Sequence, residues 1–205
     1  INDARMNYQM LQTLTDFTDE ELGQVSKDTK DKIKNIGSDK KVMFKALGIT
    51  KKNKNKNFLQ QAIEIYPNLL RDTYSKKIIQ QTKESLVKEG RAGKLNILGK
   101  YTFICPDLYA FCEYLFLGHK NPKGLLSNEE VYCKLYENNI KLDCLRSPHL
   151  YKEHAVRKNT IDELKEKWFI TNGLYTSTHD LISKILQFDN DGDCSLVVAD
   201  PTRSE

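Results

Sequence analysis

The chain has 205 residues, 39% of them hydrophobic, and is long enough to bury the core of one large domain or two small ones. No apolar run reaches the roughly 18 residues of a membrane-spanning helix, and the N-terminus lacks a signal-peptide pattern. We therefore expect no membrane partner and a cytoplasmic location. Residues 1–100 hold 20 Lys or Arg against 12 Asp or Glu, whereas residues 101–205 hold 12 against 16. This asymmetry indicates a polyanion partner on one side and a cation site on the other.

Cysteine and histidine spacing argues against the common zinc sites. The five cysteines include no C-x-x-C pair, and the four histidines show no H-x-x-x-H spacing. An odd number of cysteines also argues against a full disulfide framework, so most are expected to be buried apolar side chains. Because the chain begins with Ile1, we expect a fragment or a processed product of a longer protein.

The first ninety residues are predicted to be helical. Thr18 and Glu21 form a capping-box pattern, which predicts that a helix begins at residue 19. Glycines and Pro67 divide the helical periodicity into segments. The expected helices cover residues 19–35, 39–47, 58–66 and 68–89, after a short apolar face at residues 10–17.

The lysine-rich stretch KKNKNKN, residues 51–57, has two interpretations. A solvated loop is the one we favour, because runs of charge are usually exposed. The alternative is a contact with a phosphate backbone, which gives salt-dependent binding without sequence selectivity.

From Lys94 onward the pattern changes to alternating, β-forming residues. Strands are expected at residues 94–107, 129–137, 141–148, 167–173 and 194–200, and residues 179–188 are expected to form a short helix or an apolar strand. Helices followed by strands predict an α+β fold. The expected domains are a helical region, residues 1–93, and a β-rich domain, residues 94–205.

The β-rich domain carries three aspartates within five residues, Asp189, Asp191 and Asp193. Three ionised carboxylates this close repel one another unless a cation compensates them. Hard divalent ions prefer oxygen ligands, and Gly192 allows the tight turn that brings alternate carboxylates together. The loop therefore predicts a Mg²⁺, Mn²⁺ or Ca²⁺ site, and the alternative is an ordinary surface turn rich in Asp and Gly.

Two known aspartate motifs fit this loop poorly. An EF-hand calcium loop needs glycine at its sixth position, where this chain has Cys194, and an exiting helix, where it has Pro201. The haloacid-dehalogenase phosphatase motif opens its domain, whereas only twelve residues follow Asp193. A calcium-binding EF-hand-like module remains an alternative.

The sequence D-x-D-G-D, residues 189–193, resembles the metal-binding loop of multisubunit RNA polymerases, which lies in a double-psi β-barrel. It also resembles the matching loop of eukaryotic RNA-dependent RNA polymerases and of single-chain bacteriophage polymerases. The upstream segment LRSPHLYKEH, residues 145–154, looks like the R-x-P-x-L segment of those enzymes. The segments NILGKYTFICPD, residues 96–107, and GLLSNEEVYCKLY, residues 124–136, are similar to their paired barrel strands. The resemblance covers residues 94–200 and implies a double-psi β-barrel-like catalytic domain.

By this resemblance the chain is part of a template-directed RNA polymerase, a nucleotidyltransferase. Asp189, Asp191 and Asp193 would hold Mg²⁺, with Mn²⁺ as a substitute. Arg146 would approach the ribose of the incoming nucleotide, with Pro148 shaping the turn. A purely structural Arg146, paired with Asp143 or a loop carbonyl, is the competing interpretation.

The implied partners are a nucleic-acid template, the RNA product and nucleoside triphosphates. A second barrel bearing lysines would come from the same full-length chain or a partner subunit, so the isolated fragment is expected to be inactive. A non-catalytic nucleic-acid-binding module is the alternative function. Richness in Asn, Lys and Ile indicates an AT-rich genome, such as that of a bacterium or its mobile elements.

Overall fold

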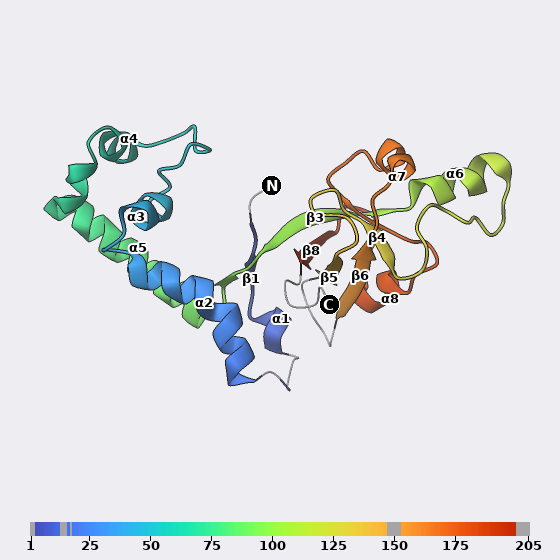
Figure 1. Ribbon diagram of the computed structural model, residues 1–205, viewed down its shortest axis with the longest axis horizontal. Coiled ribbons are helices and arrows are strands. Elements are labelled where there is room, and N and C mark those ends of the chain that lie inside the picture. Colours follow the sequence, from blue (N-terminus) through green and yellow to red (C-terminus); the bar gives the residue numbers. More distant parts are fainter. Residues whose placement is uncertain (1–2, 13–15, 17, 147–152, 200–205) are drawn as a thin grey trace. The chain divides into compact units, whose positions relative to one another are not determined.

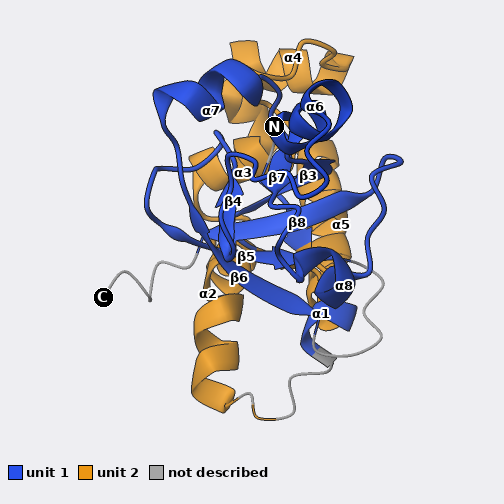
Figure 2. Ribbon diagram, turned by 90° about the vertical axis from the view of Figure 1, so that its right-hand side faces the viewer, with its two compact units in different colours: residues 1–5, 9–15, 97–205 blue, residues 6–8, 16–96 orange. Residues whose placement is uncertain are grey.

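A computed structural model describes residues 3–12, 16, 18–146 and 153–199. The chain divides into two compact units, coloured separately in Figure 2. A helical unit contains residues 16–96 together with 6–8, and a barrel unit contains residues 97–205 together with 1–5 and 9–15. Among the described residues, no helix combines the length and the apolar character needed to cross a membrane.

The helical unit is built from helices whose first residues are capped by side chains. Thr18 and Glu21 form the predicted capping box before the first long helix. The side chains of Asp39, Asn57 and Asp72 accept backbone N–H groups at the starts of three further helices. The elements are α2 (Asp19–Asn35), α3 (Lys40–Ala46), α4 (Phe58–Ile65), the 3₁₀ helix η1 (Pro67–Arg71) and α5 (Thr73–Arg91) (Figure 1).

Isoleucine and leucine side chains from these elements meet in a separate small core. Ile63 is fully buried, and the other members of the cluster are at most 8% exposed. Burial of such side chains contributes about 1.5–3 kcal/mol each, which holds the short helices in place. The buried members are Ile36, Ile49, Ile63, Leu70 and Ile79.

The barrel unit contains six strands that close in the order β3-β7-β4-β6-β5-β8. The pairs β3–β7 and β4–β6 are parallel, and the other four pairs are antiparallel. Closure leaves no open sheet edge. The strands are β3 (Gly99–Pro106), β4 (Glu130–Tyr132), β5 (Lys141–Leu145), β6 (His154–Asn159), β7 (Leu174–Thr176) and β8 (Cys194–Ala199).

Helices also connect strands of the barrel, and short elements lie before α2 and between α5 and β3. The connecting helices are α6 (Leu108–Leu117), α7 (Glu163–Trp168) and α8 (Ile182–Leu186) (Figure 1). A two-stranded sheet pairs β1 with β2. The short elements are β1 (Arg5–Met6), α1 (Gln9–Gln12) and β2 (Leu95–Asn96).

The barrel core is made by apolar side chains from the strands and from α8. Val131, Leu142, Leu174 and Val197 are fully buried strand residues of this core. Ile182 and Leu186 of α8 belong to the same cluster. Because α8 is packed into the barrel by these side chains, the segment that follows it starts from a fixed position.

The structure confirms the predicted α+β class with helices followed by a closed barrel, and it corrects several predicted elements. The predicted strand over 167–173 is wrong: Trp168 ends α7, and the strand lies at Leu174–Thr176. The predicted strand over 129–137 shortens to Glu130–Tyr132. Segment 179–188 contains the helix α8, and helix α6 and strand β6 were not expected.

The physical reason for the misplaced strand is a helix cap. The Asp162 carboxylate accepts hydrogen bonds from the N–H groups of Leu164 and Lys165, which starts α7. Phe169 is then buried from an irregular segment, stacked on Tyr175 with ring centroids 4.4 Å apart. The β-forming residues of segment 167–173 therefore pack in the core without forming a strand.

Candidate active site

The aspartate loop, residues 189–193, connects α8 to β8. Gln187 ends α8 in the left-handed conformation, with φ of 49°. Gly192 has φ of 126°, a backbone region that L side chains rarely adopt, although a Cβ there would meet no atom within 4 Å. The glycine is therefore required by backbone conformation and not by crowding. Asp189 and Asp191 are exposed.

Asp193 holds the loop closed. Its Oδ2 atom accepts a hydrogen bond from the Asp189 N–H at 2.9 Å. The same oxygen lies 2.8 Å from Nη2 of Arg146, and both side chains are only one-quarter exposed. The contact between Asp193 and Arg146 unites two sequence motifs that are 47 positions apart.

Arg146 reaches the loop because strands β5 and β8 are paired. Leu145, the last residue of β5, lies opposite Leu196 of β8, so the next residue of the chain is beside the start of β8. Nη1 of Arg146 also donates a hydrogen bond to the Gln187 carbonyl. One guanidinium therefore bonds both the residue that ends α8 and the last aspartate of the loop.

These contacts separate the two interpretations of Arg146 only in part. Arg146 does bond a loop carbonyl, as the structural interpretation expects. Asp143, its other suggested partner, pairs instead with His154, whose Nδ1 lies 2.9 Å from the Asp143 Oδ2. Pro148 lies outside the described residues, and its role in shaping the turn stays a prediction.

The His154–Asp143 pair has a defined electrostatic character. Burial acts to lower the pKa of His154, but the hydrogen bond and the negative charge of Asp143 outweigh it and raise the pKa. Asp143 lies on β5 and His154 on the neighbouring strand β6, and their pairing was not predicted from the sequence. Cys133 and Cys144 are buried, and burial raises the pKa values of their thiols. Cys105 and Cys112 are only half-buried and Cys194 is exposed, so the prediction that most cysteines are buried is wrong.

The donor chemistry of the loop fits a divalent cation, although its carboxylates are not gathered. Among the described residues, no three His, Cys, Asp or Glu side chains are arranged to hold a metal ion. Asp189 and Asp191 extend to solvent, while Oδ2 of Asp193 is engaged by Arg146. Three hard oxygen donors within five residues nevertheless match Mg²⁺ or Mn²⁺ in type.

The EF-hand alternative is wrong. Positions six to eleven of such a loop fall on Cys194–Ala199, which form the barrel strand β8. Leu196 and Val197 of this strand are fully buried and paired with β3 and β5. A helix–loop–helix calcium site cannot be built from a segment whose second half closes a barrel.

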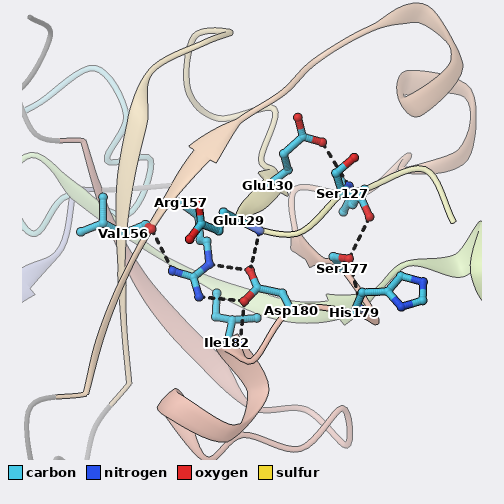
Figure 3. Close-up of polar contacts among 10 residues, drawn as sticks. Ser127, Glu129, Glu130, Val156, Arg157, Ser177, His179, Asp180 and Ile182 are labelled. Carbon is cyan, nitrogen blue, oxygen red and sulfur yellow. Dashed lines mark hydrogen bonds and ion pairs between the residues drawn. The ribbon is translucent and has the colours of Figure 1, made fainter. Parts of the chain in front are cut away.

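A buried ion pair that the sequence did not reveal lies at the other end of α8 (Figure 3). Arg157 of β6 bonds both oxygens of Asp180 through Nε and Nη2, the second contact measuring 2.7 Å. The Asp180 side chain is 2% exposed and that of Arg157 is 11% exposed. Asp180 also accepts the N–H groups of Ile182, in the first turn of α8, and of Glu129, before β4.

The charges of this pair are mutually stabilised. Burial acts to raise the pKa of Asp180, but its hydrogen bond and ion pair with Arg157 outweigh burial and lower the pKa. The hydrogen bonds that Arg157 donates to Asp180 in turn raise the pKa of Arg157. Asp180 and Arg146 thus fix the two ends of α8, the helix that delivers the aspartate loop.

Known proteins resemble this chain in sequence and in fold. No protein-family model matches the sequence. The chain is 56% identical over 199 residues to the DNA-directed RNA polymerase YonO of Bacillus phage SPbeta. The aligned region covers 97% of this chain and 24% of that protein.

The fold is also similar to a solved structure. RNA-dependent RNA polymerase QDE-1 from Thielavia terrestris superposes with a TM-score of 0.66 and 13% identity, over 98% of this chain and 25% of that one. The chain therefore spans about a quarter of the length of each of these proteins. These findings confirm the predicted resemblance to the double-psi β-barrel region of RNA polymerases.

Proposed function

We propose that this chain is the catalytic-barrel segment of a template-directed RNA polymerase, in which Asp189, Asp191 and Asp193 hold Mg²⁺. The observation that supports this most is the Arg146–Asp193 contact, because it joins the two motifs that carry the resemblance. The 56% identity to a DNA-directed RNA polymerase supports a DNA template over an RNA template.

Each side chain of the loop has a distinct part in this proposal. Asp189 and Asp191 are the exposed carboxylates available to a cation, and Asp193 is the one already oriented by Arg146. Bound Mg²⁺ would lower the pKa of the primer 3′-hydroxyl and offset charge on the transferred phosphate. Arg146, while the loop is without metal, compensates part of the charge of the three carboxylates.

The remaining machinery must come from outside this chain. Nucleoside triphosphates, template and RNA product are the proposed partners, and a second barrel with lysines would contact the phosphates. Because phosphoryl transfer depends on positioning and on charge stabilisation, the segment alone should not polymerise. No observation on the described residues favours the non-catalytic module over this function.

Metal binding provides a direct test of the loop. Mn²⁺ at ten times its dissociation constant should stabilise the folded chain by about 1.4 kcal/mol and raise the Tm of a barrel of this size by several degrees. The measurement is differential scanning calorimetry with and without Mn²⁺. In an Asp189→Asn, Asp191→Asn double variant the shift should disappear, and an equal shift in that variant would exclude these carboxylates as ligands.

Sugar selection tests the role of Arg146. In the full-length polymerase, Arg146→Gln should reduce the preference for ribonucleotides over deoxyribonucleotides by about 10- to 100-fold, which is the loss of one charge-assisted hydrogen bond. The measurement is the ratio of kcat/KM for matched NTP and dNTP substrates. If kcat falls and the ratio stays constant, Arg146 acts only by bridging Gln187 and Asp193.

A further inference from the structure

The helical unit contains a pocket of about 650 Å³ that the aspartate loop does not explain. It lies among α3, η1, α5 and the turn after α2. Of the described side chains that line it, none is acidic and four are cationic, namely Lys40, Arg71, Lys76 and Lys83. A concave surface of one charge sign concentrates ions of the opposite sign.

The sequence around the pocket also carries an excess of positive charge. Between residues 36 and 83 the chain has eleven Lys or Arg against three Asp or Glu. The excess of positive charge in the first half of the chain is therefore concentrated around this pocket. Lysines of the KKNKNKN stretch belong to the same segment, although none of them lines the pocket.

The few acidic side chains in this segment are occupied elsewhere. Asp39 and Asp72 accept backbone N–H groups at the starts of α3 and α5. Glu64 pairs with Lys56 at 2.6 Å, outside the pocket lining. Within the described part of the chain, the four lining cations therefore form no ion pair. Lys83 donates a hydrogen bond to the Ile36 carbonyl at 3.4 Å, and Lys40 lies over the Phe44 ring, so no carboxylate neutralises their charge.

The rest of the lining indicates which anion fits. Its floor is apolar, formed by buried Ile36, Leu70 and Ile79. Among the residues that the structure describes, no aromatic side chain lines the pocket, so bases have no ring there on which to stack. Cations without stacking partners favour contacts with phosphates over stacked bases, and a pocket of this size accommodates a nucleotide-sized ligand or a short stretch of one strand.

We propose that this pocket binds the phosphodiester backbone of single-stranded nucleic acid, without base selectivity. A single strand can bend into a concave pocket, whereas the stiff rod of a duplex cannot enter it. The site lies in the helical unit and requires neither the metal nor the aspartates of the proposed active site. It would give the chain a second contact with nucleic acid.

Neighbouring lysines provide a matched pair of variants. Lys40 and Lys76 line the pocket, whereas Lys41 and Lys77, the next residues on the same helices, are exposed and do not. The Lys40→Gln, Lys76→Gln and Lys41→Gln, Lys77→Gln double variants lose the same charge from the same elements. Binding of a fluorescent dT12 oligonucleotide to the 205-residue chain is measured by anisotropy between 50 and 300 mM salt.

The pocket variant should bind dT12 about ten-fold more weakly at low salt. Its log–log salt slope should be smaller by about 1.4, because two phosphate contacts are lost from a single strand. The control variant should differ from wild type by less than about two-fold in affinity. Equal losses in both variants would overturn the proposal, since they indicate a diffuse charge effect.

Two further measurements identify the ligand and separate this site from the loop. Competition by ATP or inorganic phosphate as strong as that by unlabelled dT12 would assign the pocket to a small anion and overturn the nucleic-acid assignment. A 12-base-pair duplex should compete less well than the single strand. The Lys40→Gln, Lys76→Gln variant should keep the Mn²⁺-induced Tm shift of the wild type, so failure of the proposed catalytic loop and failure of the pocket are distinguishable.

Discussion

Replacing Asp191 with Ala should lower nucleotide incorporation by the full-length polymerase about 10³-fold or more. Loss of a metal ligand removes several kcal/mol of transition-state stabilisation, and each ~1.4 kcal/mol corresponds to a factor of ten. Asp191 is the informative choice because it is exposed and takes no part in the described contacts that close the loop. Its replacement therefore removes a candidate ligand and leaves the fold intact.

Two variants of the same loop are the controls. Asn190→Ala alters a neighbouring exposed residue without removing a carboxylate and should retain incorporation within about two-fold. Asp193→Ala should be inactive as well, but it also releases Arg146 and the Asp189 N–H, so its effect combines chemistry and loop structure. Primer extension with radiolabelled NTP is the assay. Incorporation by Asp191→Ala at the rate of wild type would end the assignment of this loop to catalysis.

The sequence was most informative where a pattern is confined to neighbouring residues. Three aspartates around Gly192 are visible as a pattern because the motif occupies consecutive residues. The helix start at Thr18 was predictable for the same reason, since a capping box needs only residues three positions apart. Both signals depend on short-range chemistry, which a linear sequence contains.

The strands were harder to predict because barrel pairing is not local. Strand β6, His154–Asn159, has few β-forming residues and exists because it pairs with both β5 and β4. Helix α6 is rich in aromatic residues that also suit strands, and the Asp107 cap and the left-handed Gly118 are what define its ends. Tertiary context outweighed local propensity in these segments.

The contacts that hold the candidate site in position could not be predicted from the sequence for a related reason. Asp180 and Arg157 are 23 positions apart and belong to no motif, so only closure of the barrel brings them together. Arg146 was predicted as a ribose contact from its motif, yet its bond to Asp193 depends on the register of β5 against β8. Residues that hold a loop in position are thus harder to predict from the sequence than residues that form the loop.

Asp180→Asn should destabilise the chain by about 3 kcal/mol, because it leaves Arg157 charged and largely buried without its partner. Asp162 is a matched control: it also accepts backbone N–H groups at a helix start, and it pairs with Lys165, whose side chain is likewise 11% exposed. Asp162 itself is 51% exposed, however, so water can replace its carboxylate beside the Lys165 ammonium. Asp162→Asn should cost about 1 kcal/mol or less. Urea unfolding of the two variants measures this difference, and equal losses would contradict a special contribution from the buried pair.

The dependence of this effect on pH follows from the lowered pKa of Asp180. A carboxyl whose pKa is lower in the folded than in the unfolded chain stabilises the fold at pH values above the unfolded pKa. That contribution is lost as the pH falls through the folded pKa. The difference in unfolding free energy between wild type and Asp180→Asn should therefore be full at neutral pH and shrink in acid.

The same substitution should loosen the aspartate loop, because Asp180 bonds the Ile182 N–H in the first turn of α8 and α8 leads directly into the loop. Amides 187–193 should exchange hydrogen about ten-fold faster in Asp180→Asn, and Mn²⁺ should bind correspondingly more weakly. Phe169→Ala supplies a control of similar or larger global cost, about 3–5 kcal/mol, in a cluster separate from that of α8. If Phe169→Ala raises the hydrogen-exchange rates of amides 187–193 as much as Asp180→Asn does, the faster exchange reflects general destabilisation of the fold. If only Asp180→Asn raises these rates, Asp180 is a positioning residue for the aspartate loop.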